Sequence, residues 1–178
     1  VFTLLFVFIY WIDKGGNIAL NTVELLRAAG VDAQLLVVGT IIPDLPFEMA
    51  QNFEALFTKY NKANICFVAP TDSEERIKQI TQNAQKFIYM VAYAGITGSG
   101  QKEDLTTVIN NVRKHSSTPL YIGFGVDENT CKEKIIGVDG VIVGSAFVKH
   151  IIDDSLSNDE KIKKISAIAK EIKEKINE

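Results

Sequence analysis

Short apolar runs alternate with amphipathic stretches along the whole chain, and together they predict six strand–helix units. The apolar runs are rich in Val, Ile, Leu and Phe, and they predict strands at residues 1–12, 35–42, 65–69, 87–92, 120–122 and 140–143. Apolar residues at helical spacing predict helices at residues 21–29, 46–60, 73–84, 101–114, 128–136 and 157–177. This alternation favours a parallel α/β architecture with right-handed crossovers.

The last three predicted strands each end in glycine. They read FIYMVAYAGITGSG (87–100), LYIGFGV (120–126) and GVIVGSAFVKH (140–150), and the glycine breaks recur at intervals of roughly 20 to 27 residues, about one unit of a parallel α/β barrel. Glycine lets backbone N–H groups approach an oxyanion, and a helix N-terminus just beyond supplies further donors. In such barrels the loops after strands seven and eight usually hold phosphate, so this segment predicts a phosphate-binding end.

Composition narrows the class of protein. The length of 178 residues suits one domain, expected over residues 1–178, although a complete eight-fold barrel typically has about 250 residues. A net charge of −3 gives no general attraction to nucleic acid or to anionic membranes, so a phosphate site must use local backbone donors. Two distant cysteines show no metal spacing and favour a reducing, cytoplasmic setting. The uncharged run at residues 1–12 is shorter than the about 20 residues of a membrane helix, which favours a buried strand.

The three glycine-ended strings resemble the last three strand–loop units of the tryptophan synthase alpha chain. IIPDLPFE (41–48) resembles the strand-4 motif of that family and NICFVAPT (64–71) its strand 5, so the likeness runs from Ile41 to Lys149. The resemblance implies a TIM (β/α)8-type barrel and a lyase that cleaves indole-3-glycerol phosphate to indole and glyceraldehyde 3-phosphate in tryptophan biosynthesis. It implies no cofactor on this chain, since pyridoxal phosphate belongs to the beta subunit, and it implies an alpha-beta-beta-alpha hetero-oligomer.

The resemblance also assigns a phosphate site. Main-chain groups at matching positions bind the substrate phosphate in the family, and these positions are Gly98, Phe124, Gly125, Gly144 and Ser145. The hydroxyl of the serine would be an extra donor. The plainer alternative is that the glycines only form tight turns between strands and helices.

Three residues, one of them again Phe124, match the substrate pocket, and one further residue matches a subunit interface. Tyr89, Thr97 and Phe124 stand at positions that line the pocket, with Phe124 as an aromatic wall for an indole ring. Asp44 matches an acidic residue near the beta-subunit interface. A core tyrosine at position 89 and a turn-capping aspartate at position 44 are the alternatives.

The family's catalytic carboxylates have no counterpart motif in this sequence. They lie in a segment resembling ELGxPFSDPxADGP, which is absent here, and the apolar run at residues 1–10 contains no acidic residue. Either the first two strand–helix units are lacking or the N-terminal region has diverged, and the catalytic residues are unassigned in both cases. Two other functions stay open: a non-catalytic phosphate-binding regulatory subunit, and another phosphate-binding barrel enzyme.

Overall fold

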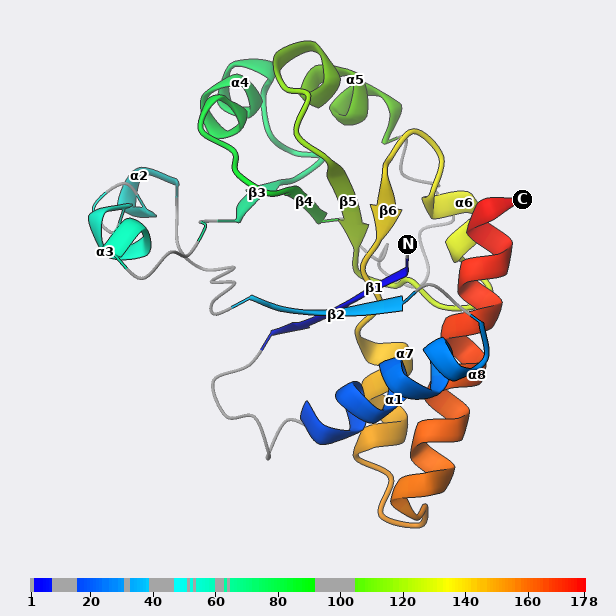
Figure 1. Cartoon of the computed structure of the whole chain (residues 1–178). Helices are drawn as coiled ribbons and strands as arrows, with labels where there is room; N and C mark the ends of the chain where they lie inside the picture. The colour runs from blue at the N-terminus through cyan, green and yellow to red at the C-terminus, as the bar shows by residue number, and fades with distance from the viewer. Residues whose placement is uncertain are drawn as a thin grey trace. The chain divides into compact units, whose positions relative to one another are not determined.

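The computed structural model describes residues 2–7, 16–30, 33–38, 47–50, 52, 54–59, 63, 65–91 and 105–178. Six strands and eight helices lie in this part of the chain (Figure 1). They divide into two compact units. The sheet unit comprises residues 41–125 and 133–142, and the helix unit comprises residues 1–40, 126–132 and 143–178. The expectation of one domain over residues 1–178 stays a prediction.

A four-stranded parallel sheet forms the centre of the sheet unit. Its strands lie in chain order, which is the order of successive strands in a βαβ series: β3 (Cys66–Val68), β4 (Ile88–Val91), β5 (Leu120–Gly123) and β6 (Gly140–Val141). Helices α4 (Glu74–Gln82) and α5 (Thr106–His115) lie side by side on one face of this sheet (Figure 1). Two shorter helices, α2 (Phe47–Ala50) and α3 (Glu54–Lys59), also belong to this unit.

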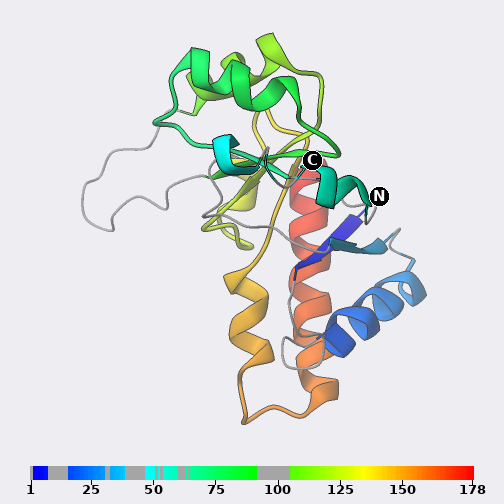
Figure 2. The ribbon, with the colours of Figure 1, turned by 90° about the vertical axis from the view of Figure 1, so that its left-hand side faces the viewer.

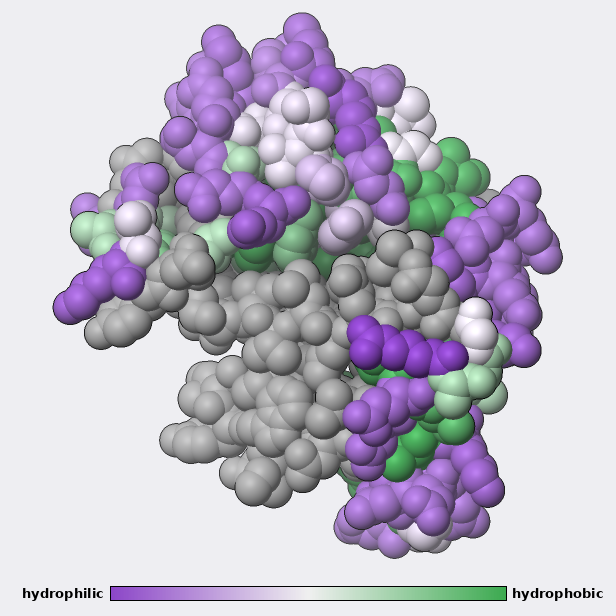
Figure 3. Space-filling view, in the orientation of Figure 1, coloured by the Kyte–Doolittle hydropathy of each residue, from purple (hydrophilic) through white to green (hydrophobic). Residues whose placement is uncertain are grey.

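Period-two alternation along the strands separates a buried face from a half-buried face. In β4, Ile88 and Met90 are fully buried, whereas Tyr89 and Val91 are partly exposed. The buried face packs against α4 and α5, and the resulting core consists of Cys66, Val68, Ile77, Ile80, Ile88, Met90, Val108, Val112, Leu120 and Ile122. The opposite surfaces of the two helices are hydrophilic (Figure 3), as an amphipathic helix over a sheet requires.

The predicted start of the helix at residue 73 is confirmed to within one residue, and Cys66 lies in the core of the sheet unit. Cys66 is buried as a small apolar residue, and burial raises the pKa of its thiol to about 11. Helix α4 begins after Ser73, whose Oγ accepts a hydrogen bond from the N–H of Arg76 at 3.3 Å. This bond satisfies one of the first N–H groups of the helix, which have no partner within the helix itself.

The helix unit contains a two-stranded parallel sheet and three helices. Strands β1 (Phe2–Val7) and β2 (Ala33–Val38) pair in register from Phe2 opposite Ala33 to Val7 opposite Val38. Helix α8 (Asn158–Asn177) packs against α1 (Gly16–Ala28) and runs beside α7 (Ser145–Ile151), as Figure 2 shows. The core here consists of Val23, Leu26, Phe147, Ile165 and Ala169.

Several predicted boundaries were wrong. Helix α1 begins at Gly16 rather than at residue 21, and the predicted helix at 46–60 is described as two separate helices, α2 and α3. The predicted helix at 128–136 contracts to α6 (Cys131–Lys134), because the Asp127 carboxylate binds the N–H groups of residues 129 and 130 in a turn and Gly137 adopts a left-handed φ of 80°. The six predicted strands are all present, in chain order and parallel within each sheet.

Among the described residues, no helix combines the length and the apolar character that a membrane crossing needs.

Candidate functional site

The turn at the carboxyl end of β5 has an unusual backbone conformation. Phe124 has a φ of 73° and Gly125 a φ of 63°, so two consecutive residues lie in the left-handed region. Glycine enters that region without steric cost, whereas a bulky residue such as phenylalanine seldom does. A non-glycine residue held there points to a functional constraint on the loop, and this loop is one that the sequence assigned to phosphate.

An aromatic cluster lies beside this turn. It consists of Phe67, Tyr89 and Phe124, which come from β3, β4 and the end of β5. The rings of Phe67 and Tyr89 stack with centroids 5.1 Å apart, and the edge contact between Tyr89 and Phe124 spans 6.3 Å. Phe124 is 53% exposed, so the cluster presents an aromatic surface at the carboxyl end of the sheet.

Strand register explains how the cluster forms. Phe67 lies opposite Tyr89 on the neighbouring strand, and Tyr89 lies opposite Tyr121 on the next. These residues share the half-buried face of the sheet because each lies one position away from a fully buried core residue. Burial raises the pKa of the Tyr89 phenol above its ordinary value. Like any tyrosine hydroxyl at neutral pH, it is protonated and can donate a hydrogen bond.

Gly123 makes room for Tyr89. A Cβ built on Gly123 would lie 1.9 Å from Oη and 2.4 Å from Cζ of Tyr89, far inside contact distance. The glycine at position 123 is therefore required by the packing of Tyr89. Of the two glycines at 123 and 125, Gly125 is the one with a left-handed backbone.

A lysine contacts the same turn from the following helix. Lys134, the last residue of α6, donates from Nζ to the carbonyl oxygen of Phe124 at 3.0 Å. Both residues belong to the sheet unit.

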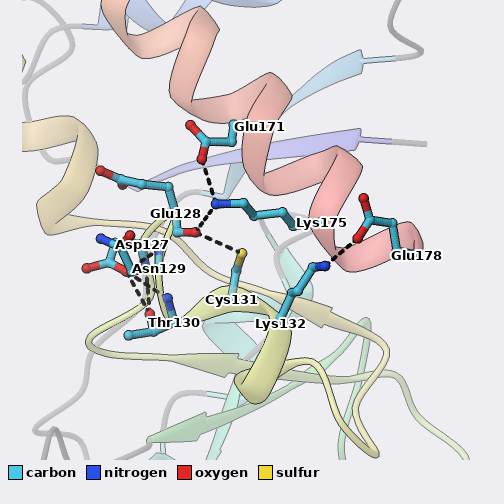
Figure 4. A network of polar contacts seen from close by, with 9 residues as sticks. All are labelled: Asp127, Glu128, Asn129, Thr130, Cys131, Lys132, Glu171, Lys175 and Glu178. Atoms are coloured by element: carbon cyan, nitrogen blue, oxygen red, sulfur yellow. Dashed lines mark hydrogen bonds and ion pairs between the residues drawn. The ribbon is translucent and has the colours of Figure 1, made fainter.

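The segment after this turn is an Asx turn in the helix unit. Oδ1 of Asp127 accepts hydrogen bonds from the N–H groups of Asn129 and Thr130, both at 2.9 Å, and from the Thr130 hydroxyl at 3.0 Å (Figure 4). Burial alone would raise the pKa of Asp127. The hydrogen bonds, together with the charge of Lys149, outweigh that effect and hold the pKa of the carboxyl below its ordinary value.

Lysines join the same segment to the end of α8. Lys175 donates to the carbonyl oxygen of Glu128 at 2.7 Å and to Oε1 of Glu171 at 2.6 Å, and Lys132 forms an ion pair with Glu178 (Figure 4). These contacts fix the start of α6 within the helix unit.

We expect Asp127→Ala to lower the free energy of unfolding by about 0.5–2 kcal/mol. This is the usual cost of removing a side chain that accepts hydrogen bonds from backbone N–H groups just before a helix. Because the folded pKa is depressed, this stabilisation is complete above the unfolded pKa of about 3.9 and is lost as pH falls through the folded pKa. Urea titrations across this pH range measure both effects, with Asp154→Ala, at an exposed aspartate of the same unit, as control. Equal losses in the two variants would contradict the assignment.

Gly144 and Ser145 lie together at the start of α7 in the helix unit. Gly144 is the residue preceding the helix, and its carbonyl oxygen accepts from the N–H groups of Phe147 at 2.9 Å and Val148 at 3.1 Å. Both Gly144 and Ser145 are exposed. No heavy atom within the described part of the chain lies within 4 Å of a Cβ built on Gly144, so the fold itself does not demand glycine there.

The predicted site residues thus fall into three groups. Tyr89 and Phe124 are in contact and adjoin Gly125, while Gly144 and Ser145 adjoin each other in the other unit. Thr97, Gly98 and Asp44 lie outside the described residues. Sequence reasoning missed Phe67 and Lys134. The alternation of β3 beside β4 could have suggested Phe67, but no motif marks Lys134.

Comparison with known proteins decides the family. The family model described as tryptophan synthase alpha chain matches residues 17–177. The chain belongs to the tryptophan synthase alpha family. The tryptophan synthase alpha chain of Wolinella succinogenes is 53% identical over 142 residues, which are 79% of this chain and 56% of that protein. The one from Petrotoga mobilis is 41% identical over 138 residues, covering 76% and 54%.

Solved structures of tryptophan synthase alpha subunits have the same fold. The subunit from Campylobacter jejuni superposes with a TM-score of 0.65 at 27% identity over 93% of this chain and 64% of that one. The chain from Legionella pneumophila gives 0.65 at 24% identity, covering 98% and 62%. The described parallel α/β units are therefore part of a TIM barrel.

The match to the tryptophan synthase alpha family begins at residue 17, before the motifs that first suggested it. The likeness therefore includes α1 and β2, which the sequence motifs from Ile41 onward did not reach. The chain spans about half the length of the curated relatives it matches.

Proposed function

We propose that this chain contributes the phosphate- and indole-binding part of a lyase that cleaves indole-3-glycerol phosphate. The observation that carries the proposal is the contact of Tyr89 with Phe124 beside the left-handed Phe124–Gly125 turn, at the carboxyl end of β5 in a barrel of this family. Ligands of TIM barrels bind at that end of the strands. An aromatic surface suits an indole ring, and closely approachable backbone N–H groups suit a phosphate.

The reaction is a retro-aldol cleavage that yields indole and glyceraldehyde 3-phosphate. An acid protonates C3 of the indole ring while a base removes the proton of the glycerol hydroxyl, and the bond between C3 and the glycerol chain breaks. Two positioned carboxylates would serve, but this sequence carries no counterpart of the family's acidic motif, so we assign no catalytic residue.

For the phosphate, we propose main-chain contacts at five positions. They are Gly98, Phe124, Gly125, Gly144 and Ser145, with the Ser145 hydroxyl as a further donor. Tyr89, Thr97 and Phe124 would line the pocket around the rest of the substrate. A site made of uncharged main-chain donors accords with the chain's net charge of −3, which offers no general attraction to anions.

The proposed partner is a tryptophan synthase beta subunit in an alpha-beta-beta-alpha assembly in the cytoplasm. That subunit carries pyridoxal phosphate, and we propose no cofactor for this chain. Asp44 is the proposed contact residue at the subunit interface.

The test is an assay of indole and glyceraldehyde 3-phosphate released from indole-3-glycerol phosphate, with and without added beta subunit. Release of both products in equal amounts would support the lyase. Binding of the substrate without release of products would support the substrate site but contradict cleavage by this chain. A chain that neither binds nor cleaves the substrate would overturn the proposal.

We expect Gly144→Val to weaken phosphate binding by at least about tenfold, because the side chain would occupy the space that the ligand needs. Unfolding should change by about 1 kcal/mol or less, since the φ of −117° lies outside the left-handed region that favours glycine. Calorimetry with glycerol 3-phosphate and urea unfolding measure the two quantities. Gly144→Ala should give a smaller loss of affinity, and unchanged affinity in both variants would remove Gly144 from the site.

A further inference from the structure

The contact between Lys134 and Phe124 joins a charged side chain to the backbone of the proposed phosphate loop. Nζ of Lys134 lies 3.0 Å from the carbonyl oxygen of Phe124, and the lysine side chain is half-buried at the end of α6. This carbonyl belongs to the peptide group between Phe124 and Gly125, which are two of the residues proposed to bind phosphate.

A peptide group is planar, so a contact that holds its C=O group also fixes the direction of its N–H group. In a trans peptide the C=O and N–H bonds point in opposite directions, and no cis peptide occurs in the described residues. With the carbonyl of Phe124 directed at Lys134, the N–H of Gly125 points away from the lysine. Rotation of this peptide group would break the charge-assisted hydrogen bond, which is stronger than a bond between neutral groups.

The backbone at Phe124 needs such support. A left-handed phenylalanine is uncommon and costs free energy, and it persists only when its surroundings hold it. Lys134 is one such constraint, and the edge contact of the Phe124 ring with Tyr89 is another. The first fixes the backbone of the residue, and the second fixes its side chain.

We propose that Lys134 is a positioning residue for phosphate binding: its ammonium group holds the Phe124 carbonyl and thereby sets the direction of the Gly125 N–H. The proposal rests on the proposed function, since it takes this loop as part of the phosphate site. Lys134 does not itself need to contact the ligand.

The same helix supplies a matched control. Lys132 lies two residues earlier in α6 and has the same charge, but it pairs with the carboxylate of Glu178 instead of a loop carbonyl. Lys134→Met and Lys132→Met therefore remove the same charge from the same helix, and only the first removes the contact with the Phe124 carbonyl.

The experiment measures two properties of the full chain in each variant. Carbon-13 NMR of a chain labelled at the Phe124 carbonyl reports the hydrogen bond directly, in the absence of ligand. Calorimetry with inorganic phosphate at constant ionic strength reports the affinity. Lys134→Met should shift the carbonyl resonance and weaken phosphate binding by about three- to tenfold. Lys134→Arg, which keeps the charge and the donors, should restore most of the affinity, and Lys132→Met should leave both readings unchanged.

The failures of the two proposals are distinguishable. An unshifted Phe124 resonance in Lys134→Met, or phosphate affinity equal to that of the wild type, would overturn the role of Lys134 while the phosphate site stands. Equal losses of affinity in Lys134→Met and Lys132→Met would also overturn it, by pointing to net charge alone. A wild-type chain that binds no phosphate would overturn the proposed site, and the role of Lys134 with it.

Discussion

Gly123→Ala is expected to lower the free energy of unfolding of the sheet unit by about 1–3 kcal/mol, the usual cost of an overpacked interior. The new Cβ would lie 1.9 Å from Oη of Tyr89, and the tyrosine ring cannot move aside freely because it stacks on Phe67 at 5.1 Å. The displaced ring would also lose its contact with Phe124, so binding of an aromatic ligand should weaken together with stability. Urea unfolding and calorimetry measure the two losses.

A double-mutant cycle tests whether the ring of Tyr89 is the reason why Gly123→Ala destabilises the sheet unit. Tyr89→Ala alone should destabilise the unit by removing a half-buried ring, but it also opens the space that the new Cβ of Gly123→Ala needs. The double variant should therefore be clearly more stable than the sum of the two single losses predicts. Strict additivity would show that Gly123 is required for a reason other than Tyr89.

Ile122→Ala should cost about 2–5 kcal/mol, whereas Ile136→Ala should change stability by no more than about 0.5 kcal/mol. Both substitutions delete the same atoms in the same unit. The difference is burial, because Ile122 is fully buried in the core under α4 and α5, while Ile136 is 70% exposed. Urea or thermal unfolding followed by circular dichroism measures both, and similar losses in the two variants would contradict the assigned core.

Features that depend on residues close together in the sequence were predictable, whereas features that depend on contacts between distant residues were not. The strands at 65–69, 87–92 and 120–122 were predictable because period-two alternation and flanking turn residues are local signals, and each lies within two residues of its observed bounds. Ser73 was predictable as a cap for the same reason. The helix around residue 131 was overextended, because the competing hydrogen bonds of Asp127 depend on a turn geometry that apolar spacing does not report.

The residues of the candidate site show the same difference between local and long-range signals. Glycine strings and family resemblance identified Gly125 and Gly144, but they did not decide between close approach of a ligand and a tight turn as the reason for each glycine. The structure separates a left-handed backbone at Gly125 from an open surface at Gly144, and it attributes Gly123 to the ring of Tyr89. Lys134 could not be found from sequence, because a lysine ten residues after Phe124 reaches its carbonyl only once α6 has folded back.

The proposed site is best tested by calorimetry of a non-cleavable, indole-bearing glycerol phosphate analogue beside plain glycerol 3-phosphate. We predict that the indole compound binds clearly tighter, since the aromatic surface of Phe124 and Tyr89 adds to the phosphate contacts, and that Gly144→Val weakens binding of both compounds. Equal affinity for the two compounds would contradict the indole pocket, and no binding of either would contradict the phosphate site.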